Sequence, residues 1–293
     1  MANPIRIGVI GAGRNTRALH IPNLQKISGV EVVSVVNRSR ESSQCVASQF
    51  KIGRVHDNWR DLIADPAIDA IVIGTWPYLH CPITLAALAA GKHVLTEARM
   101  AMNAAEVAEM VAVSGETGRF LMEAMWMRFN PLHVELQRRI ASGEFGAVQR
   151  IESDFSFAAP RTAEHRLFDP AKGGGALLDV GIYPLTLAWW WLGAPTSWTA
   201  AGEIGPTGVD ESVTLDLGWS TGATARLTCG STRDGSRESV ITCERATITI
   251  PTPSHASPVA HIVTANDTET VECAAPGLHH QVVEVQRCLA AGL

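Results

Sequence analysis

Two stretches of this sequence carry residue types and spacings that could do chemistry. The first is Gly11-Ala12-Gly13, which directly follows an apolar run that begins at Ile5. At the end of a strand, Gly11 would permit a tight turn and Gly13 would let the backbone approach a pyrophosphate. We therefore count both glycines, with Arg14 and Asn15 after them, as candidate cofactor contacts. The third position of this pattern is Thr16, neither Gly nor Ala, so a tight turn without a ligand is the alternative.

The second stretch runs from Lys172 to Pro184 and contains a carboxylate and a phenol. Asp179 and Tyr183 are four residues apart, so on a helix they share one face. Three glycines precede them, which lets a ligand or another segment come close. Pro184 predicts a kink in the helix. Such a pair can handle the proton of a substrate hydroxyl, although a buried Asp–Tyr pair can also be purely structural.

The end of the second expected strand, at residues 31–36, bears on the choice of cofactor. NAD-binding folds usually place Asp or Glu here to bind the ribose 2′-hydroxyl, but this chain has Asn37, Arg38 and Ser39. A guanidinium and a hydroxyl can instead hold a 2′-phosphate through charge-assisted hydrogen bonds. The sequence therefore favours NADP over NAD. Solvated residues at a helix start are the alternative.

Strands alternate with helices in the first part of the chain. Because the crossovers are helical, we expect an α/β fold with a doubly wound parallel sheet, a Rossmann domain over residues 1–122. Ligands bind at the carboxyl ends of such strands, which places Gly11, Asn37, Thr75 and Glu97 along one edge. The apolar runs that predict strands are residues 5–10, 31–36, 69–75, 93–97 and 120–122.

After Met122 the pattern changes. Apolar residues alternate with polar ones at 213–219 and again at 225–229, and this style continues at 248–250. Period-two alternation is typical of an antiparallel sheet with one polar face. We therefore expect a second, α+β domain over residues 123–293, with a large, mostly antiparallel open sheet.

Composition limits the classes of function. The chain has 293 residues, a net charge of −5 and 46% hydrophobic residues, enough for two cores. No Lys/Arg run suggests nucleic-acid binding, and no apolar run is long enough to cross a membrane. The six cysteines lie far apart without metal-ligand spacing, so we expect reduced thiols, no metal and a cytoplasmic protein without a signal peptide.

Six segments, taken together, show a resemblance that covers nearly the whole chain. They resemble, in order, motifs of the Gfo/Idh/MocA family of NAD(P)-dependent oxidoreductases, especially its dihydrodiol dehydrogenase and anhydrofructose reductase branch. The segments are Gly11–Gly13, Thr75–His80, Ala90–Glu97, Met122–Phe129, His165–Leu167 and Gly173–Tyr183.

The resemblance implies roles for particular residues. Asp179 and Tyr183 match the family's catalytic pair beside the substrate hydroxyl, where many members have His in place of Tyr. Arg166 matches an arginine that reaches the cofactor. Other implied cofactor contacts are Thr75, Trp76, His80, Glu97 and Ala98. Weaker candidates for substrate contacts are Arg99, Trp126, Arg128, His165 and Lys172.

One departure from the family concerns catalysis. The family's Glu-Lys-Pro is Glu97-Ala98-Arg99 here, so the lysine that assists proton transfer is replaced by alanine. The family's proline commonly follows a cis bond, but a cis bond before Arg99 costs about 2.5–4 kcal/mol, so we expect a trans bond. A tyrosine with a pKa of about 10 is a poor base near neutral pH unless a cation favours the phenolate. Arg99, Arg128, Arg166 or Lys172 would have to supply that cation.

The resemblance implies hydride transfer between a nicotinamide and a hydroxyl-bearing carbon of a sugar, polyol, cyclitol or cyclic diol. Because of Ala98, two other functions stay open: a non-catalytic NADP-binding or regulatory protein, and a redox-assisted glycosidase or lyase. Relatives pair through the open sheet face, so we expect a homo-oligomer, a dimer or tetramer. The chain stops soon after Leu289, where relatives continue, so we expect a short or incomplete C-terminus.

Overall fold

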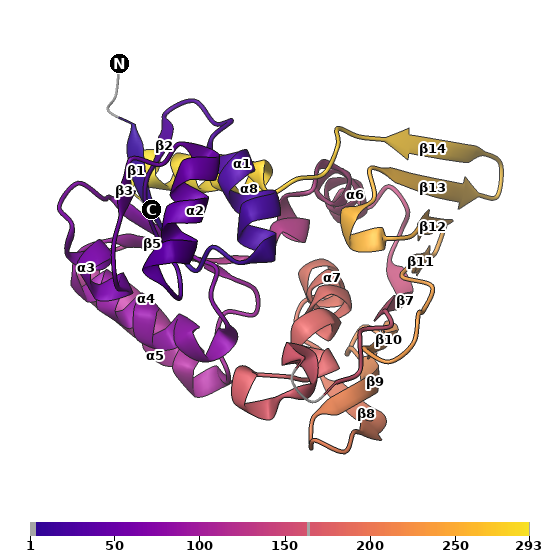
Figure 1. The fold of residues 1–293 in the computed structure, drawn as a ribbon. Helices are drawn as coiled ribbons and strands as arrows, with labels where there is room; N and C mark the ends of the chain where they lie inside the picture. The colour runs from indigo at the N-terminus through magenta and orange to yellow at the C-terminus, as the bar shows by residue number, and fades with distance from the viewer. Residues whose placement is uncertain (1–3, 163–164, 293) are drawn as a thin grey trace. The chain divides into compact units, whose positions relative to one another are not determined.

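The computed structural model describes residues 4–162 and 165–292. Contacts divide the chain into two units (Figure 1). The first contains the residues up to Trp126 together with those from Gly277 onward, and the second is Met127–Pro276. This division differs from the expected one in two ways. The boundary lies slightly after residue 122, and the last helix, α8 (His279–Ala291), belongs to the first unit.

The first unit is built on a six-stranded sheet with the order β3-β2-β1-β4-β5-β6. Every neighbouring pair is parallel, which confirms the doubly wound parallel sheet. All four residues of β4 are buried, as expected of a strand covered on both faces. The strands are β1 (Ile5–Ile10), β2 (Val30–Val36), β3 (Arg54–Val55), β4 (Ala70–Ile73), β5 (His93–Glu97) and β6 (Leu121–Ala124).

Helices cover both faces of this sheet. On one face, α3 (Trp59–Ala64) and α4 (His80–Ala89) pack with Ile71 and Ile73 of β4. On the other face, the core contains side chains of α1 (Ile21–Leu24), α2 (Arg40–Phe50) and α8. Helix α5 (Ala104–Thr117) lies against α4.

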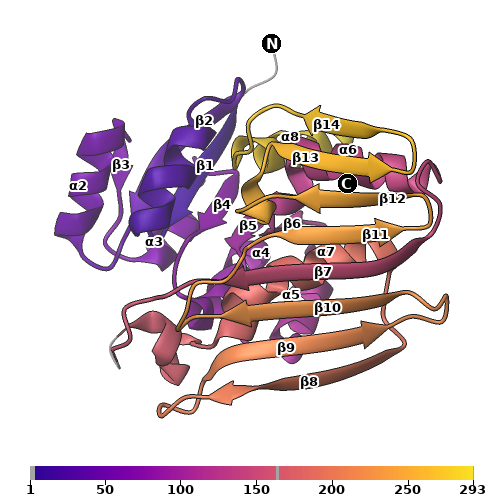
Figure 2. The same ribbon diagram turned by 90° about the vertical axis from the view of Figure 1, so that its right-hand side faces the viewer.

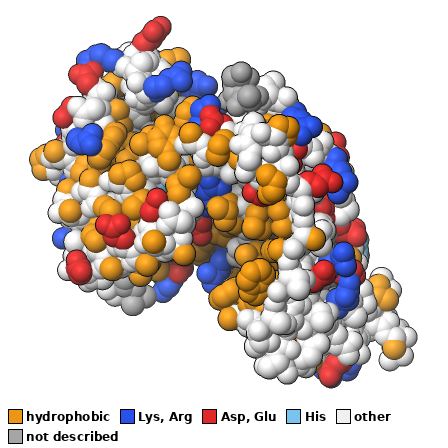
Figure 3. All heavy atoms as spheres, turned by 90° about the horizontal axis from the view of Figure 1, so that it is seen from below, with side chains coloured by type: hydrophobic (Ala, Val, Ile, Leu, Met, Phe, Trp, Pro, Cys, Tyr) orange, Lys and Arg blue, Asp and Glu red, His pale blue; other side chains and the backbone are white. Residues whose placement is uncertain are grey.

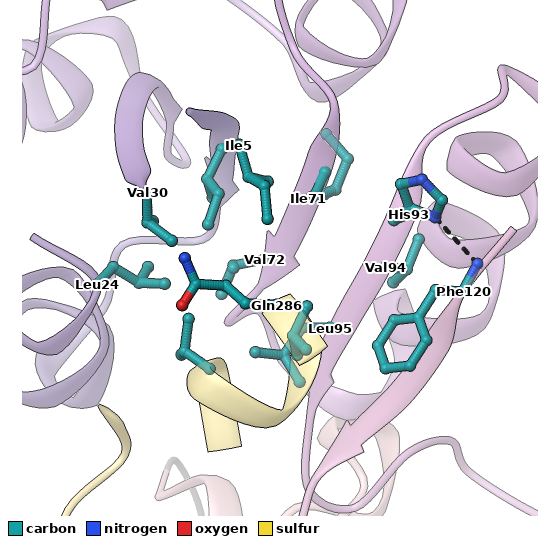
Figure 4. Close-up of a pocket in the computed structure, with 14 residues that line it drawn as sticks. Ile5, Leu24, Val30, Ile71, Val72, His93, Val94, Leu95, Phe120 and Gln286 are labelled. Atoms are coloured by element: carbon teal, nitrogen blue, oxygen red, sulfur yellow. Dashed lines mark hydrogen bonds between the residues drawn. The ribbon is translucent and has the colours of Figure 1, made fainter. Parts of the chain in front are cut away.

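Helix α8 is part of the core of the first unit, although it follows the whole second unit in sequence. Val282 and Val285 are buried with the sheet residues. Gln286 donates a hydrogen bond from Nε2 to the carbonyl of Ser28 (2.9 Å). Figure 4 shows Gln286 beside Val30 and Leu24, at a small apolar cavity of about 20 Å³. The first unit is therefore discontinuous in sequence.

The second unit contains an eight-stranded sheet with the order β14-β13-β12-β11-β7-β10-β9-β8, seen face-on in Figure 2. Neighbouring strands are antiparallel except β7 and β10, which are parallel. This confirms the expected large, mostly antiparallel sheet. The strands are β7 (Val148–Ser156), β8 (Ser197–Ile204), β9 (Asp210–Gly218), β10 (Thr224–Gly230), β11 (Ser239–Cys243), β12 (Ala246–Ile250), β13 (Val259–Thr264) and β14 (Thr268–Glu272).

The two faces of this sheet differ in chemistry. One face packs against a π-helical turn, Leu177–Gly181, and against α7 (Ile182–Leu192), with α6 (Pro131–Ala141) next to α7. The other face, toward the viewer in Figure 2, carries ion pairs such as Arg150–Glu152. The alternation along the strands thus separates an apolar face from a polar one.

The surface and the helices of the described residues give two further observations. On the face drawn in Figure 3, acidic and basic side chains are interspersed rather than gathered by sign. No helix among residues 4–162 and 165–292 is long and apolar enough to cross a membrane.

Candidate functional site

The turn after β1 has the geometry that a dinucleotide needs. Gly11 has a φ of +86°, and a Cβ there would come within 2.7 Å of the Thr75 nitrogen, so a side chain is excluded. At Gly13, a Cβ would meet none of the described atoms within 4 Å. The backbone of this loop therefore borders open space into which a phosphate can fit.

Thr16 explains why the third glycine of the pattern is missing. Its side chain is buried, and its hydroxyl donates a hydrogen bond to the carbonyl of Gly11 (2.9 Å). The helix after the loop begins at this residue as a π-helical turn, Thr16–His20, before it continues as α1. Thr16 thus closes the turn with its hydroxyl.

A pocket of about 500 Å³ opens between the carboxyl ends of β1, β2 and β4. This is the point where the strand order reverses, the place where open α/β sheets bind ligands. Its wall includes Gly11, Gly13, Asn37, Arg38 and Thr75 from the expected set. It also includes Ser42, Asp57, Asn58, Trp59 and Tyr78, which sequence reasoning missed. Asp57 to Trp59 follow β3, whose carboxyl end lies at the same sheet edge as those of its neighbours. Their position in the sequence could therefore have identified them as candidate pocket residues.

The three residues after β2 have different tasks. Asn37 donates from Nδ2 to the Ala12 carbonyl (3.2 Å), which ties the strand end to the glycine turn. Ser39 caps α2, because its hydroxyl accepts a hydrogen bond from the Ser42 N–H (3.2 Å). Arg38 is exposed and lines the pocket with Ser42. Arg38 is therefore the better placed of the two candidates for a 2′-phosphate.

His80 is buried beneath the pocket and joins two loops. Its Nδ1 lies 2.9 Å from the Arg99 carbonyl, and its Nε2 lies 3.1 Å from the Thr75 carbonyl. Burial lowers the pKa of His80, and a neutral ring can donate to only one of these carbonyls. His80 thus holds the Thr75 loop in place, while Trp76, 42% exposed, lines the pocket.

Glu97, at the end of β5, is paired with a histidine that the sequence did not single out. Its Oε1 lies 2.6 Å from Nε2 of His20, and its Oε2 accepts a hydrogen bond from the Ala98 N–H (3.2 Å). Burial raises the pKa of Glu97, but His20 and the Ala98 N–H outweigh burial, so the pKa lies below its ordinary value. Glu97 is therefore a carboxylate anchored next to Ala98.

The expectation of a trans bond before Arg99 is wrong, because the Ala98–Arg99 peptide bond is cis. Contacts on both sides fix this segment: the Arg99 carbonyl faces His80, and the Met100 N–H donates to Glu123 (2.7 Å). The preference of a non-proline peptide bond for the trans form is therefore outweighed by tertiary contacts. The Arg99 side chain is buried in the first unit, with Nη2 3.8 Å from the Met102 sulfur.

In the second unit, the glycine-rich stretch leads into the helix that carries the acid and the phenol. Asp210 accepts a hydrogen bond from the Leu177 N–H (2.6 Å) at the start of the helix. A Cβ at Gly175, whose φ is +119°, would collide with the Asp210 carboxylate. Asp179 lies in the π-helical turn and Tyr183 in the first turn of α7. The π-helical irregularity therefore lies at residues 177–181, just before Pro184.

Arg166 and Asp179 are brought together. Their side chains form an ion pair of 2.7 Å, and both are only partly exposed. The guanidinium of Arg166 therefore holds the carboxylate of the expected catalytic pair.

Tyr183 packs against two aromatic rings. Its ring centroid lies 5.2 Å from that of Phe155 on β7 and 5.3 Å from that of His255. His255 is stacked on Phe155 with a centroid distance of 4.3 Å. His255 comes from the turn between β12 and β13, so no local sequence signal linked it to Tyr183.

The weaker candidates have local contacts. Arg128 is exposed, with its guanidinium 5.3 Å from the Trp190 ring centroid. His165 starts the short turn Arg166–Phe168 and accepts a hydrogen bond from Leu167 (3.4 Å). Lys172 pairs with Asp169 (2.7 Å), and Trp126 is half-buried. Arg14 and Asn15 are exposed beside the glycine turn. Within the described residues, no group of three or more metal-ligating side chains is suitably arranged.

Comparison with known families agrees with this geometry. A model of the NAD-binding Rossmann domain of the GFO/IDH/MocA oxidoreductase family matches residues 5–125. A model of the GFO/IDH/MocA C-terminal domain matches residues 133–249. Among curated proteins, trans-1,2-dihydrobenzene-1,2-diol dehydrogenase from Danio rerio is 31% identical over 277 residues, covering 90% of this chain and 81% of its own length.

Two solved structures share the fold over nearly the whole chain. A 3-ketoreductase from Actinomadura kijaniata, crystallised with NADP and TDP-benzene, has a TM-score of 0.88 at 24% identity and covers 99% of this chain and 91% of its own. An aldose-aldose oxidoreductase from Caulobacter crescentus has a TM-score of 0.90 at 22% identity, and the match covers 99% of this chain and 90% of its own.

Proposed function

Because this chain belongs to the Gfo/Idh/MocA family of oxidoreductases, we propose that it transfers hydride between NADP and a hydroxyl-bearing carbon. The substrate is a sugar, cyclitol or cyclic diol. The observation that carries the proposal is the ion-paired Asp179 one helical turn before Tyr183. A carboxylate and a phenol on one helix face are suited to hold a hydroxyl and move its proton.

The first unit fits the cofactor. The open space at Gly13 accommodates the pyrophosphate, and the pocket at the switch point has room for the adenosine part. Arg38 and Ser42 line this pocket and supply a charge and a hydroxyl for a 2′-phosphate. When bound, the nicotinamide supplies the carbon that gives or takes the hydride.

The residues of the second unit handle the proton. Tyr183 exchanges a proton with the substrate hydroxyl, while Asp179 orients that hydroxyl. Arg166 supplies the cation that the family lysine would otherwise supply, through its ion pair with Asp179. Because a guanidinium stays protonated in proteins, Arg166 acts only through its charge and never as the base.

A second candidate function is a non-catalytic NADP-binding or regulatory protein. Ala98 favours it, because a methyl group can neither donate a proton nor carry charge. This function keeps the pocket of the first unit and leaves Asp179 and Tyr183 as structural residues.

One experiment separates the two functions. NADPH formation is followed with trans-1,2-dihydrobenzene-1,2-diol and with aldoses, for the wild type and Tyr183→Phe. Turnover that Tyr183→Phe abolishes, at unchanged NADP affinity, supports the oxidoreductase. Tight NADP binding without turnover of any diol, sugar or polyol would favour the non-catalytic NADP-binding protein.

The proposal extends to assembly and compartment. The polar open face of the eight-stranded sheet is the surface through which we propose that copies pair into a dimer or tetramer. The six cysteines are free thiols, which is consistent with a reducing cytoplasm. Analytical ultracentrifugation of wild type and Glu152→Arg tests the pairing.

A further inference from the structure

A small cavity of about 10 Å³ lies beside Tyr183, inside the second unit. This volume is close to the smallest that holds one water molecule, and such a water needs polar partners. Most of the wall surface is apolar, but the lining includes polar residues. Its polar lining residues are Tyr183, His255, Ser153, Ser239, Ser254 and Asp154.

The three serines form a chain of hydrogen bonds. Ser153 Oγ lies 2.6 Å from Ser239 Oγ, and Ser239 donates to Ser254 Oγ (2.9 Å). All three are buried, although they come from β7, β11 and the turn before β13. A hydroxyl donates one hydrogen bond and accepts two, so such a chain can pass a proton along.

His255 connects the cavity to the outside. It follows Ser254 directly, lies 5.3 Å from the Tyr183 ring and is only half-buried. Burial lowers the pKa of His255 to about 4, and His133 on α6 and Arg237 act in the same direction. Its ring is therefore neutral near pH 7, and it can relay a proton by taking one on one nitrogen while the other nitrogen gives one up.

Asp154 is the acidic residue among those that line the cavity. Its Oδ1 accepts hydrogen bonds from Ser156 (2.7 Å) and Thr228 (2.8 Å), and its Oδ2 accepts one from the Arg237 N–H (2.9 Å). The Asp154 carboxylate is thus occupied by the sheet and the loop after it. The path proposed below therefore uses His255 and the serines, and not Asp154.

We propose that His255, one water in this cavity and the serine chain form a proton path that links the Tyr183 hydroxyl to solvent. The inference rests on the proposed function. During oxidation, the O–H bond of the substrate breaks and its proton passes to the Tyr183 oxygen, while hydride leaves the carbon for the nicotinamide. Tyr183 releases its own proton to the water, the water passes a proton to one nitrogen of His255, and the other nitrogen of His255 releases its proton to solvent. Reduction runs the same steps backwards.

This path would assist proton transfer in place of the family lysine, which is Ala98 here. Without the family lysine, Tyr183 needs another group that takes its proton away from the substrate side. His255 is a positioning and relay residue that acts through Tyr183. A neutral imidazole that ends at a half-exposed position suits this task.

Kinetics with His255→Phe give the first test, because phenylalanine keeps the stacking on Phe155 and removes both nitrogens. With trans-1,2-dihydrobenzene-1,2-diol and NADP, we expect kcat to fall about tenfold or more while KM changes little.

In His255→Ala, added imidazoles should restore the rate in proportion to their basicity. A side chain that only fills space would not give this dependence. Ser239→Ala should lower kcat several-fold. His261→Phe, on β13, is the matched control and should keep full activity.

NMR of ¹⁵N-histidine-labelled protein tests the link without turnover. Tyr183→Phe should move the ring nitrogen signal of His255, whereas Tyr78→Phe, the chain's other tyrosine, should not. An unmoved His255 signal, or His255→Phe at full rate with the wild-type pH profile, overturns the path. The proposed function itself fails if Tyr183→Phe stays active or if the wild type turns over no diol, sugar or polyol. Neither result depends on His255, so the two failures are distinguishable.

Discussion

The guanidinium of Arg166 lies 2.7 Å from the carboxylate of Asp179, one helical turn before Tyr183. A cation therefore stands beside the proposed catalytic pair in a chain that has alanine in place of the family lysine. Arg128 stacks near Trp190 and Lys172 pairs with Asp169, so each of these cations has its own contact elsewhere. Arg166 is paired with a proposed catalytic residue.

We expect Arg166→Ala to lower kcat/KM about ten- to a hundredfold, because a charge-assisted hydrogen bond contributes about 1.5–3 kcal/mol. Arg166→Lys should recover part of the rate, since it restores the charge but not the planar fork. Steady-state kinetics decide this, with Arg138→Ala as control, because Arg138 is an exposed arginine paired with Glu135. Equal rates for Arg166→Ala and wild type would contradict the role of Arg166.

Cofactor preference should depend on Arg38. We expect NADP to bind more tightly than NAD, and Arg38→Ala to weaken NADP binding about ten- to a hundredfold with little effect on NAD. Calorimetric titration of both cofactors measures this. Arg54→Ala is the matched control, because Arg54 also lies on this sheet but pairs with Asp65 (2.9 Å). If both arginine variants bind NADP alike, the assignment of Arg38 is wrong.

Restoring the family lysine gives a gain-of-function test. Ala98→Lys should raise kcat or move the pH optimum downward, because it restores the family lysine that assists proton transfer, and an ammonium favours a phenolate. Ala98 is half-buried and its N–H is bonded to Glu97, so the backbone there is already anchored. The pH profile of kcat is the measurement, with Ala98→Met as a control of similar length without charge. A Met variant that gains as much would refute the electrostatic explanation.

Two histidines should make stability fall in acid. Burial lowers the pKa of His133 to about 4, and that of His255 also to about 4. The unfolded chain binds protons at both below about pH 6.5, while the folded chain binds them only near pH 4. The free energy of unfolding should therefore decrease between these limits, by up to about 1.4 kcal/mol per pH unit for each histidine.

Urea unfolding at several pH values measures this slope. His133→Gln should reduce it by up to half, whatever its effect on stability at neutral pH. His261→Gln changes an exposed histidine bonded to Thr270 and should leave the slope unchanged. The same slope in His133→Gln and wild type would show that other groups cause the acid sensitivity.

Local pattern predicted much of the fold because both sheets follow from periodicity. The run from Ile5 into Gly11 and the alternation at 213–219 each determine one strand and its buried face. The roles of Thr16 and Ser39 were harder to predict, because a hydroxyl at such a position can cap a helix, close a turn or bind a ligand. Only the structure shows that these two serve the backbone.

The remaining features depend on contacts between residues far apart in sequence. The bond before Arg99 is determined by His80 and Glu123, and the surroundings of Tyr183 by Phe155 and His255. The periodicity of α8 indicates a buried face but not which core it covers. Periodicity and spacing report on neighbours within one element, so they say nothing of these long-range partners.

Helix α8 has a consequence for biosynthesis. A ribosome makes the six strands of the first unit early, yet Val282 and Val285, which complete one side of that core, are made only after the whole second unit. Until then, apolar side chains from β1, β2 and β4 face solvent while the whole second unit is synthesised. A ribosome-bound chain that ends before Gly277 should therefore bind chaperones, and emergence of α8 from the ribosome should mark the moment at which the dinucleotide fold becomes independent of them.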